Sequence, residues 1–204
     1  MRTSHALLLA LLAGAAAHAQ AATYTFDAND QGWFASNGGS QVHVATGGNS
    51  GGFLQLTDIS DDDFLLNAPV SALGNWTSLL GGTLSFDVKN INGDAPDWGD
   101  FGRVWITGGG KTVTADIVPG NNPPADGKWH TYSASFDTLT WGADLATVLS
   151  NVTSFQIKIE SHNGVSEING VDNVAFTSAV PEPASAVLLG LGLATVAWRR
   201  RRTS

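Results

Sequence analysis

Short segments in which apolar and polar residues alternate recur along most of the chain. In Thr83–Lys89, the apolar residues Leu84, Phe86 and Val88 fall at every second position, and residues 155–159 repeat the pattern. In an extended strand, residues two apart point to the same face, so each such segment has one apolar face and one polar, solvent-exposed face. One-sided strands of this kind suit two antiparallel sheets packed face to face. We therefore predict an all-β domain.

The predicted strands are separated by Gly, Asn, Asp and Pro, which are typical of turns. Nine segments fit: Tyr24–Phe26, Gln41–Ala45, Phe53–Thr57, Thr83–Lys89, Gly102–Thr107, Thr112–Ile117, His130–Phe136, Ser154–Glu160 and Val171–Thr177. Only Ala143–Ser150 has a helical pattern. The domain is expected to span residues 22–179, which is the length of one domain with its own core.

The first 21 residues have the features of a signal peptide. Arg2 lies in a short polar head, an apolar run follows, and small residues at 15–21 fit the A-x-A cleavage rule after either Ala19 or Ala21. We assign residues 1–21 to this export signal, which is cut by signal peptidase, and exclude them from the fold.

The last 25 residues combine three features in order. Val180-Pro181-Glu182-Pro183 precedes an uncharged stretch, Ala184–Trp198, and then the basic residues Arg199, Arg200, Arg201 and Arg202. The two prolines prevent a helix from extending backward, so a helix is expected to start after Pro183. Fifteen residues reach about 22 Å, short of the roughly 30 Å hydrocarbon core, which makes this a marginal transmembrane helix. The arginines favour the cytoplasmic side, which leaves residues 22–179 outside the cytoplasm.

This tail, residues 180–204, resembles the PEP-CTERM sorting signal of Gram-negative bacteria that make exopolysaccharide. The resemblance implies that an exosortase, a membrane-embedded transpeptidase-like enzyme, recognises the motif and releases the protein from its tail. Anchoring in the inner membrane is then transient, and the final location is the cell surface or the extracellular matrix. A plain, permanent C-terminal anchor is the alternative, since the same features would serve it.

Composition limits the partners of the domain. It has no cysteine, which excludes disulfides, thiolate nucleophiles and thiolate metal sites. Five basic residues stand against seventeen acidic ones between residues 22 and 179, a net charge of −12. Such a surface repels phosphate backbones, so nucleic acid is not an expected partner, whereas cations and neutral glycans are compatible with it.

Several short landmarks resemble the laminin type IV (laminin B) domain and its bacterial relatives. They are Phe26-Asp27 with Gln31-Gly32-Trp33, residues 64–69 (FLLNAP), residues 81–87 (GGTLSFD), residues 127–132 (GKWHTY), residues 155–159 (FQIKI) and residues 171–174 (VDNV). The resemblance implies an antiparallel jelly-roll β-sandwich of the galactose-binding-domain type. The cysteine-rich segments that flank animal laminin modules are absent, so laminin-like assembly does not follow from it.

No catalytic constellation emerges from the sequence. The segment Gly48–Gly52 contains Ser50 between glycines, but it lies between two predicted strands and is best explained as a hairpin turn. His43, His130 and His162 are far apart and have no metal-ligand spacing. Many carboxylate pairs arise by chance among seventeen acids, so a glycosidase pair cannot be identified. We therefore predict a protein that is not an enzyme.

Clustered aspartates are candidate ligands for a structural Ca²⁺ ion. Asp94, Asp97 and Asp100 crowd one Gly- and Asn-rich loop, and residues 58–63 carry four more aspartates. Oxygen ligands on such loops suit Ca²⁺, although neither cluster has EF-hand spacing. The jelly-roll resemblance implies another candidate, Asp27 with Asp172, where the first and last strands meet. Solvated turn aspartates without metal are the alternative.

Six tryptophans in the domain suggest carbohydrate binding, because flat aromatic faces pack against sugar rings. Trp98 is the candidate platform, since it lies between aspartates in a Gly/Pro loop, whereas Trp105 and Trp129 lie in or beside strands and are expected in the core. The predicted function is a non-catalytic surface or matrix protein that associates with extracellular polysaccharide. A hydrolase acting on such polymers and a structural matrix protein without a ligand are the alternatives.

Overall fold

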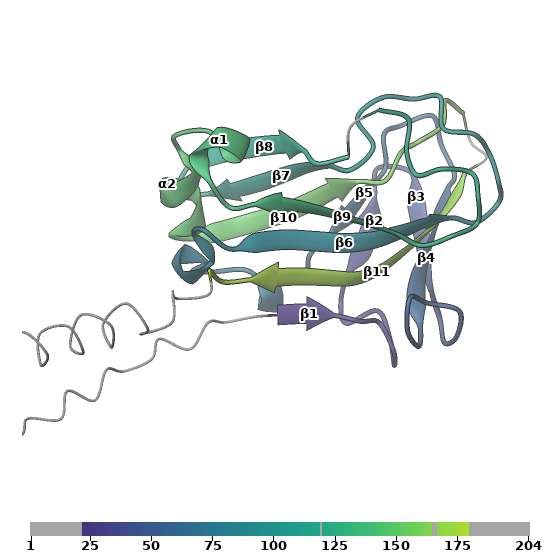
Figure 1. Ribbon diagram of the computed structural model, residues 1–204, viewed down its shortest axis with the longest axis horizontal. Coiled ribbons are helices and arrows are strands. Elements are labelled where there is room, and N and C mark those ends of the chain that lie inside the picture. Colours follow the sequence, from purple (N-terminus) through teal and green to yellow (C-terminus); the bar gives the residue numbers. More distant parts are fainter. Residues whose placement is uncertain (1–21, 119, 165–166, 180–204) are drawn as a thin grey trace, which may run out of the picture.

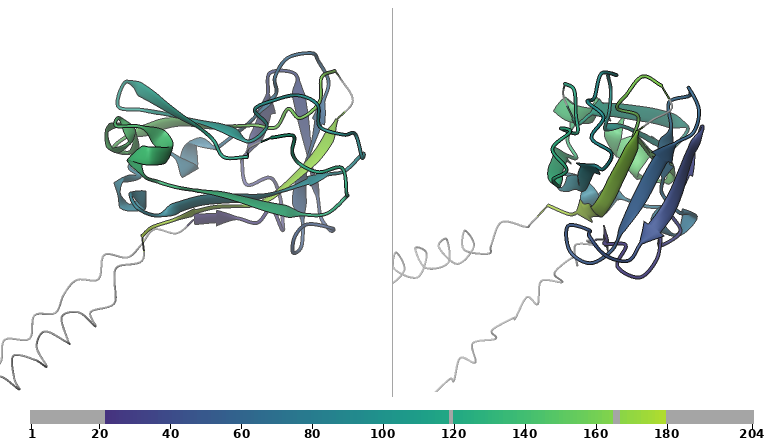
Figure 2. Two further views of the ribbon diagram at one scale, coloured as in Figure 1. Left: turned by 45° about the horizontal axis from the view of Figure 1, so that its top comes forward. Right: turned by 90° about the vertical axis from the view of Figure 1, so that its right-hand side faces the viewer.

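The domain is a sandwich of two antiparallel β-sheets, seen as two layers in Figures 1 and 2. The computed structural model describes residues 22–118, 120–164 and 167–179. The predicted signal peptide, the transmembrane helix and the sorting residues Val180, Pro181, Glu182, Pro183, Arg199, Arg200, Arg201 and Arg202 lie outside the described residues. Within those ranges, no helix is both long and apolar enough to cross a bilayer.

One sheet, called sheet A here, has the strand order β3-β4-β11-β6-β9, and β1 pairs with the second half of β11. Its strands are β1 (Ala22–Tyr24), β3 (Gly39–Val44), β4 (Phe53–Asp58), β6 (Thr83–Asn90), β9 (His130–Ser135) and β11 (Ile168–Thr177). Because Ala22 pairs with Phe176, the first and last described strands lie side by side.

The second sheet, sheet B, has the order β2-β5-β10-β7-β8. Its strands are β2 (Phe34–Ser36), β5 (Leu65–Asn67), β7 (Arg103–Gly108), β8 (Lys111–Asp116) and β10 (Val152–Lys158). Neighbours in both sheets are rarely consecutive in the chain, so the strands cross repeatedly between the two layers. This arrangement confirms the predicted all-β jelly-roll sandwich.

The core between the sheets is built by the predicted alternation. Leu84, Phe86 and Val88 of β6 are fully buried. Phe155 and Ile157 of β10 are no more than 1% exposed. Near one end, aromatic rings from several elements pack together. Phe155 lies edge to face against Phe176 with centroids 5.1 Å apart, and the Trp76 ring is tilted against Phe176 at 4.7 Å. Such pairs add to the stabilisation from burial alone.

Two short helices, α1 (Thr138–Trp141) and α2 (Leu145–Leu149), close the same end (Figure 1). Asp137 caps α1 by accepting a hydrogen bond from the Thr140 amide at 2.8 Å, and Gly142, with φ of 85°, ends it. The buried side chains of Trp141 and Leu145 seal the core there. The 3-10 turns Val70–Ala72 and Thr77–Leu79 lie between β5 and β6.

All nine predicted strands and the predicted helix are present, with ends that differ by a few residues. Strands β2 and β5 and helix α1 were not predicted, because three or four residues are too few to show a period. The expectation that Trp105 and Trp129 are core residues is wrong. Both are half-buried on outer faces, Trp105 on sheet B and Trp129 beside β9 on sheet A, where its ring lies over Gly170.

Candidate functional site

Trp98 lies at the rim of a surface cavity of about 330 Å³. The lining residues are Asp63, Trp98, Gly99, Asp100 and Lys158. Three distant segments meet here: the loop after β4, the loop between β6 and β7, and the last residue of β10. The Trp98 side chain is 42% exposed, which is unusual for so large an apolar group.

The indole of Trp98 is held in place by two charged neighbours. Its Nε1–H donates to Asp63 Oδ1 at 3.0 Å, and the Lys158 ammonium lies 5.7 Å from the ring centroid. Lys158 Nζ also contacts Asp63 Oδ1 at 2.8 Å, with a lysine side chain that is only 4% exposed. The ring is thus oriented before any ligand arrives, which lowers the entropy cost of binding to it.

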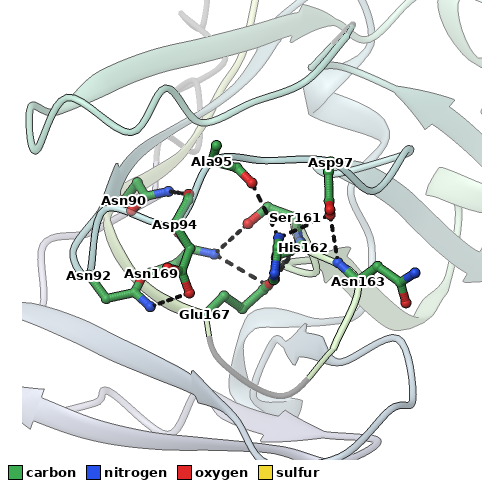
Figure 3. Close-up of polar contacts among 10 residues, drawn as sticks. All are labelled: Asn90, Asn92, Asp94, Ala95, Asp97, Ser161, His162, Asn163, Glu167 and Asn169. Carbon is green, nitrogen blue, oxygen red and sulfur yellow. Dashed lines mark hydrogen bonds and ion pairs between the residues drawn. The ribbon is translucent and has the colours of Figure 1, made fainter.

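The loop that carries Trp98 is fastened to the segment after β10 (Figure 3). The Ser161 carbonyl accepts hydrogen bonds from the amides of Asp97 at 3.0 Å and Trp98 at 3.1 Å. Asp97 Oδ1 accepts from the Asn163 amide at 2.8 Å and lies 3.0 Å from His162 Nδ1. These contacts fix the backbone on which the indole stands.

Beneath this loop lies the buried carboxyl group of Glu167. It accepts hydrogen bonds from the amides of Ser161 and His162, and its side chain is 1% exposed (Figure 3). Burial, and then the charge of nearby Glu160, raises the pKa of Glu167 to about 8, although the two amides oppose the shift. Burial likewise raises the pKa of Glu160 to about 7.

The three aspartates predicted as a loop calcium site have different partners. Asp94 accepts from Asn92 at 2.8 Å, Asp97 contacts His162 and Asn163, and Asp100 forms an ion pair with Arg103 at 2.9 Å. Across residues 22–118, 120–164 and 167–179, no group of three or more His, Asp or Glu side chains is arranged to hold a metal ion. These partners give Asp94, Asp97 and Asp100 a role in shaping the loop, and their metal binding stays a prediction.

Asp27 and Asp172, in contrast, lie against the same turn between β3 and β4. Asp27 Oδ1 accepts from the Gly52 amide at 3.3 Å, and Asp172 Oδ2 accepts from the Asn49 amide at 2.7 Å. Burial, with smaller contributions from the charges of Asp87 and Asp27, raises the pKa of Asp172 to about 6. Two carboxylates beside a turn rich in carbonyl groups are a donor set that Ca²⁺ accepts.

Comparison with protein families places this geometry in a known context. Residues 65–189 match the family model described as laminin B (domain IV), which covers more than half of the chain. The chain belongs to the laminin B (domain IV) family. Residues 179–202 also match the PEP-CTERM protein-sorting motif, which indicates an exported protein sorted by an exosortase. No curated protein matches the chain.

Similar solved structures support the fold of this laminin B domain. A family 11 carbohydrate-binding module of the cellulosomal cellulase Lic26A-Cel5E of Clostridium thermocellum has 17% identity and a TM-score of 0.50, covering 80% of this chain and 97% of the module. An exo-beta-agarase has 14% identity and a TM-score of 0.53, covering 79% of this chain and 25% of the enzyme. At these identities, the similarity establishes a shared sandwich fold only.

The sequence singled out Trp98 but missed Asp63 and Lys158 as its neighbours. Lys158 follows the alternation of an ordinary outward strand residue, and Asp63 lies in a run of aspartates. Only the pairing of β10 with β5 and β7 brings them under the indole.

Proposed function

We propose that this protein is an exported, non-catalytic polysaccharide-binding protein whose binding site includes Trp98. The observation that supports this proposal is the exposed indole, which Asp63 and Lys158 orient in the surface cavity that all three residues line. An aromatic face next to carboxylate, ammonium and backbone groups suits the apolar and hydroxyl sides of a sugar ring. The sandwich fold shared with a carbohydrate-binding module is consistent with this use.

A hydrolase is the second candidate, and Glu160 and Glu167 have the raised pKa values that a general acid needs. Both side chains are buried, however, and they accept hydrogen bonds from the backbone amides of Phe64, Ser161 and His162. A catalytic acid must reach the glycosidic oxygen, which groups enclosed in this way do not. The geometry therefore favours binding without turnover.

The test is Trp98→Ala, compared with wild type and with Trp98→Phe, by affinity electrophoresis in gels that contain the exopolysaccharide of the source bacterium. We expect Trp98→Ala to lose retention and Trp98→Phe to keep part of it, because the phenyl ring retains an aromatic face. The free energy of unfolding should change by about 1 kcal/mol or less. A loss of about 3–5 kcal/mol would show that Trp98 is a packing residue. Release of reducing sugar by wild type would contradict the non-enzymatic function.

We further propose that the sorting tail anchors the precursor in the inner membrane only until an exosortase cuts near Pro181–Pro183, after signal peptidase has removed residues 1–21. Mass spectrometry of the secreted protein should then find no peptide from Leu188–Trp198. A mature protein that retains those residues would indicate a permanent anchor instead.

A further inference from the structure

Outward side chains from all five strands of sheet B form one continuous row. The register pairs Phe34 with Asn67, Asn67 with Gln156, Gln156 with Trp105, and Trp105 with Thr114. Residues paired in this way across neighbouring strands project on the same side of the sheet. The row therefore crosses the whole sheet from β2 to β8.

This row lies on the solvent face of the sheet. Its immediate chain neighbours Leu66, Val104, Ile106 and Ile157 are fully buried, so they point inward and the row points outward. Phe34 is 47% exposed at one end, Thr114 is exposed at the other, and Trp105 is half-buried between them. Gln156 is half-buried as well, whereas Asn67 is only 8% exposed. An aromatic ring near each end of the row is thus accessible to a ligand.

The row contains no charged group. Asn67 and Gln156 lie side by side at its centre, with Gln156 Nε2 donating to Asn67 Oδ1 at 2.8 Å. This bond fixes the orientation of both amides. Asn67 Nδ2 also donates to Ser36 Oγ at 2.8 Å and to the Phe34 carbonyl at 3.2 Å, so Asn67 holds Gln156 in place. Gln156 is half-buried and uncharged, and it is the amide that the row offers to a hydroxyl-rich ligand.

The row is continuous with the Trp98 cavity. Lys158 is the next outward residue of β10 after Gln156, and it lies in the cavity beneath the indole. The two cations next to the row are paired, Lys158 with Asp63 at 2.8 Å and Arg103 with Asp100 at 2.9 Å. Asp116, the next outward residue of β8 after Thr114, is exposed and adds negative charge. This side of the sheet is therefore unfavourable for an anionic polysaccharide.

We propose that the outer face of sheet B is an extended binding surface for a linear, uncharged polysaccharide, which lies across the strands along the row from Phe34 to Thr114, flanked by Trp98. This inference rests on the proposed function. It adds the chemical class of the ligand and the path that the ligand follows across the sheet. Four strand spacings give the row a length of about 19 Å, and the spacing of about 4.8 Å is close to the advance of one sugar in an extended chain. Phe34 and Trp105 stack on separate sugars, and the Gln156 amide between them binds a hydroxyl group.

The test is isothermal titration calorimetry with neutral β-linked oligosaccharides, from disaccharides to hexasaccharides, and with oligo-uronates of the same lengths. Wild type is compared with Phe34→Ala, Trp105→Ala and Trp98→Ala. Ser133→Ala, which changes an outward residue of sheet A, is the matched control. We expect wild-type affinity to rise with the length of the neutral chain and each row variant to lose about tenfold for hexasaccharides, the equivalent of about 1.4 kcal/mol.

For disaccharides, Phe34→Ala should bind as wild type does, because a short ligand at Trp98 does not reach β2. Since Trp105 is half-buried, Gln156→Leu is a second variant in case Trp105→Ala melts early. Three results would contradict the proposed binding surface. They are an affinity that does not depend on chain length, row variants that bind hexasaccharides as wild type does, and a preference for uronates. If Trp98→Ala alone abolishes binding, the proposal of an extended binding surface on sheet B is wrong, while the proposed function stands. If wild type binds no oligosaccharide at all, both fail.

Discussion

The outer faces of sheet A and sheet B carry the same kinds of residue, but these residues have different roles on the two faces. On sheet A, the turn between β3 and β4 folds over the surface, where Asn49 Nδ2 donates to Asp87 Oδ2 at 2.8 Å and Trp129 Nε1 donates to the Gly47 carbonyl at 3.2 Å. On sheet B, Phe34 and Trp105 face solvent, and Trp98 stands exposed beside them. The aromatic ring of Trp129 is thus covered on sheet A, whereas the aromatic rings on the sheet B side are accessible to solvent.

The difference lies in the aromatic rings more than in the polar groups. Asp87, only 5% exposed, accepts from the side chains of Asn49, Thr131 and Asn173, so the sheet A network is complete within the protein. Trp129 packs on Phe53, with ring centroids 5.5 Å apart, rather than presenting a free face. On sheet B, polar groups such as Asn67 are also paired, but Phe34 and Trp98 stay exposed, so their rings remain available to a ligand.

The variant expected to have the largest effect on the difference between the two faces is Asp87→Ala. Three side-chain donors would lose their acceptor on a covered surface, so we expect the free energy of unfolding to fall by about 3 kcal/mol. Urea denaturation measures it, and polysaccharide retention of the folded fraction should not change. A stable variant that no longer binds the polysaccharide would place the binding site on sheet A instead.

Calcium offers a second test of the sheet A side. We propose that Asp27 and Asp172 share a Ca²⁺ ion with carbonyls of the turn between β3 and β4. An ion that binds only the folded state stabilises it by about 2.7 kcal/mol at a hundredfold excess over Kd. Chelation of protein shown to be metal-loaded should lower the melting temperature by several degrees, and Asp27→Asn should reduce this response. An unchanged melting curve after chelation would contradict the proposed Ca²⁺ site.

The buried carboxyl groups predict a pH dependence. Folding raises the pKa of Glu167 to about 8 from its usual 4.5, so between these values the folded protein retains a proton that the unfolded chain releases. The contribution of this group to stability is therefore fully present below pH 4.5 and is lost as pH rises toward 8, by up to about 1.4 kcal/mol per pH unit. Glu160, with a pKa of about 7, adds to the slope below pH 7.

Glu167→Gln should flatten this slope, because the amide does not ionise. Denaturant midpoints of wild type and variant, measured at intervals from pH 5 to pH 8, make the comparison. Stability that rises with pH over this range in the wild type would show that Glu167 is ionised in the folded state, contrary to its enclosed position.

Local alternation was sufficient to predict the sandwich, but not the surface that it builds. Leu84, Phe86 and Val88 show their common buried face within one segment. Trp98 could be identified because an aromatic residue in a Gly/Pro loop stands out without knowledge of the fold. Phe34 and Thr114, eighty positions apart, share a row only because strands from five separate segments pair in the order β2-β5-β10-β7-β8. No local pattern carries that order.

The error on Trp129 has a similar origin. A tryptophan beside a strand fits either face of the sheet, and its position was decided by Gly170 on β11, where a Cβ would lie 2.9 Å from the indole. The missing side chain lets the ring lie over the sheet from outside. The sorting tail, in contrast, could be identified from sequence because its motif, apolar stretch and arginines are contiguous.

The indole N–H signals of the six domain tryptophans in a ¹H–¹⁵N correlation spectrum test the central claim most directly. During titration with a neutral oligosaccharide, we expect the signals of Trp98 and Trp105 to shift, since both lie on the open side. Those of Trp33, Trp76, Trp129 and Trp141 should stay in place. Shifts confined to Trp129, or a saturating titration that leaves Trp98 and Trp105 unmoved, would contradict the assignment of polysaccharide binding to the outer face of sheet B.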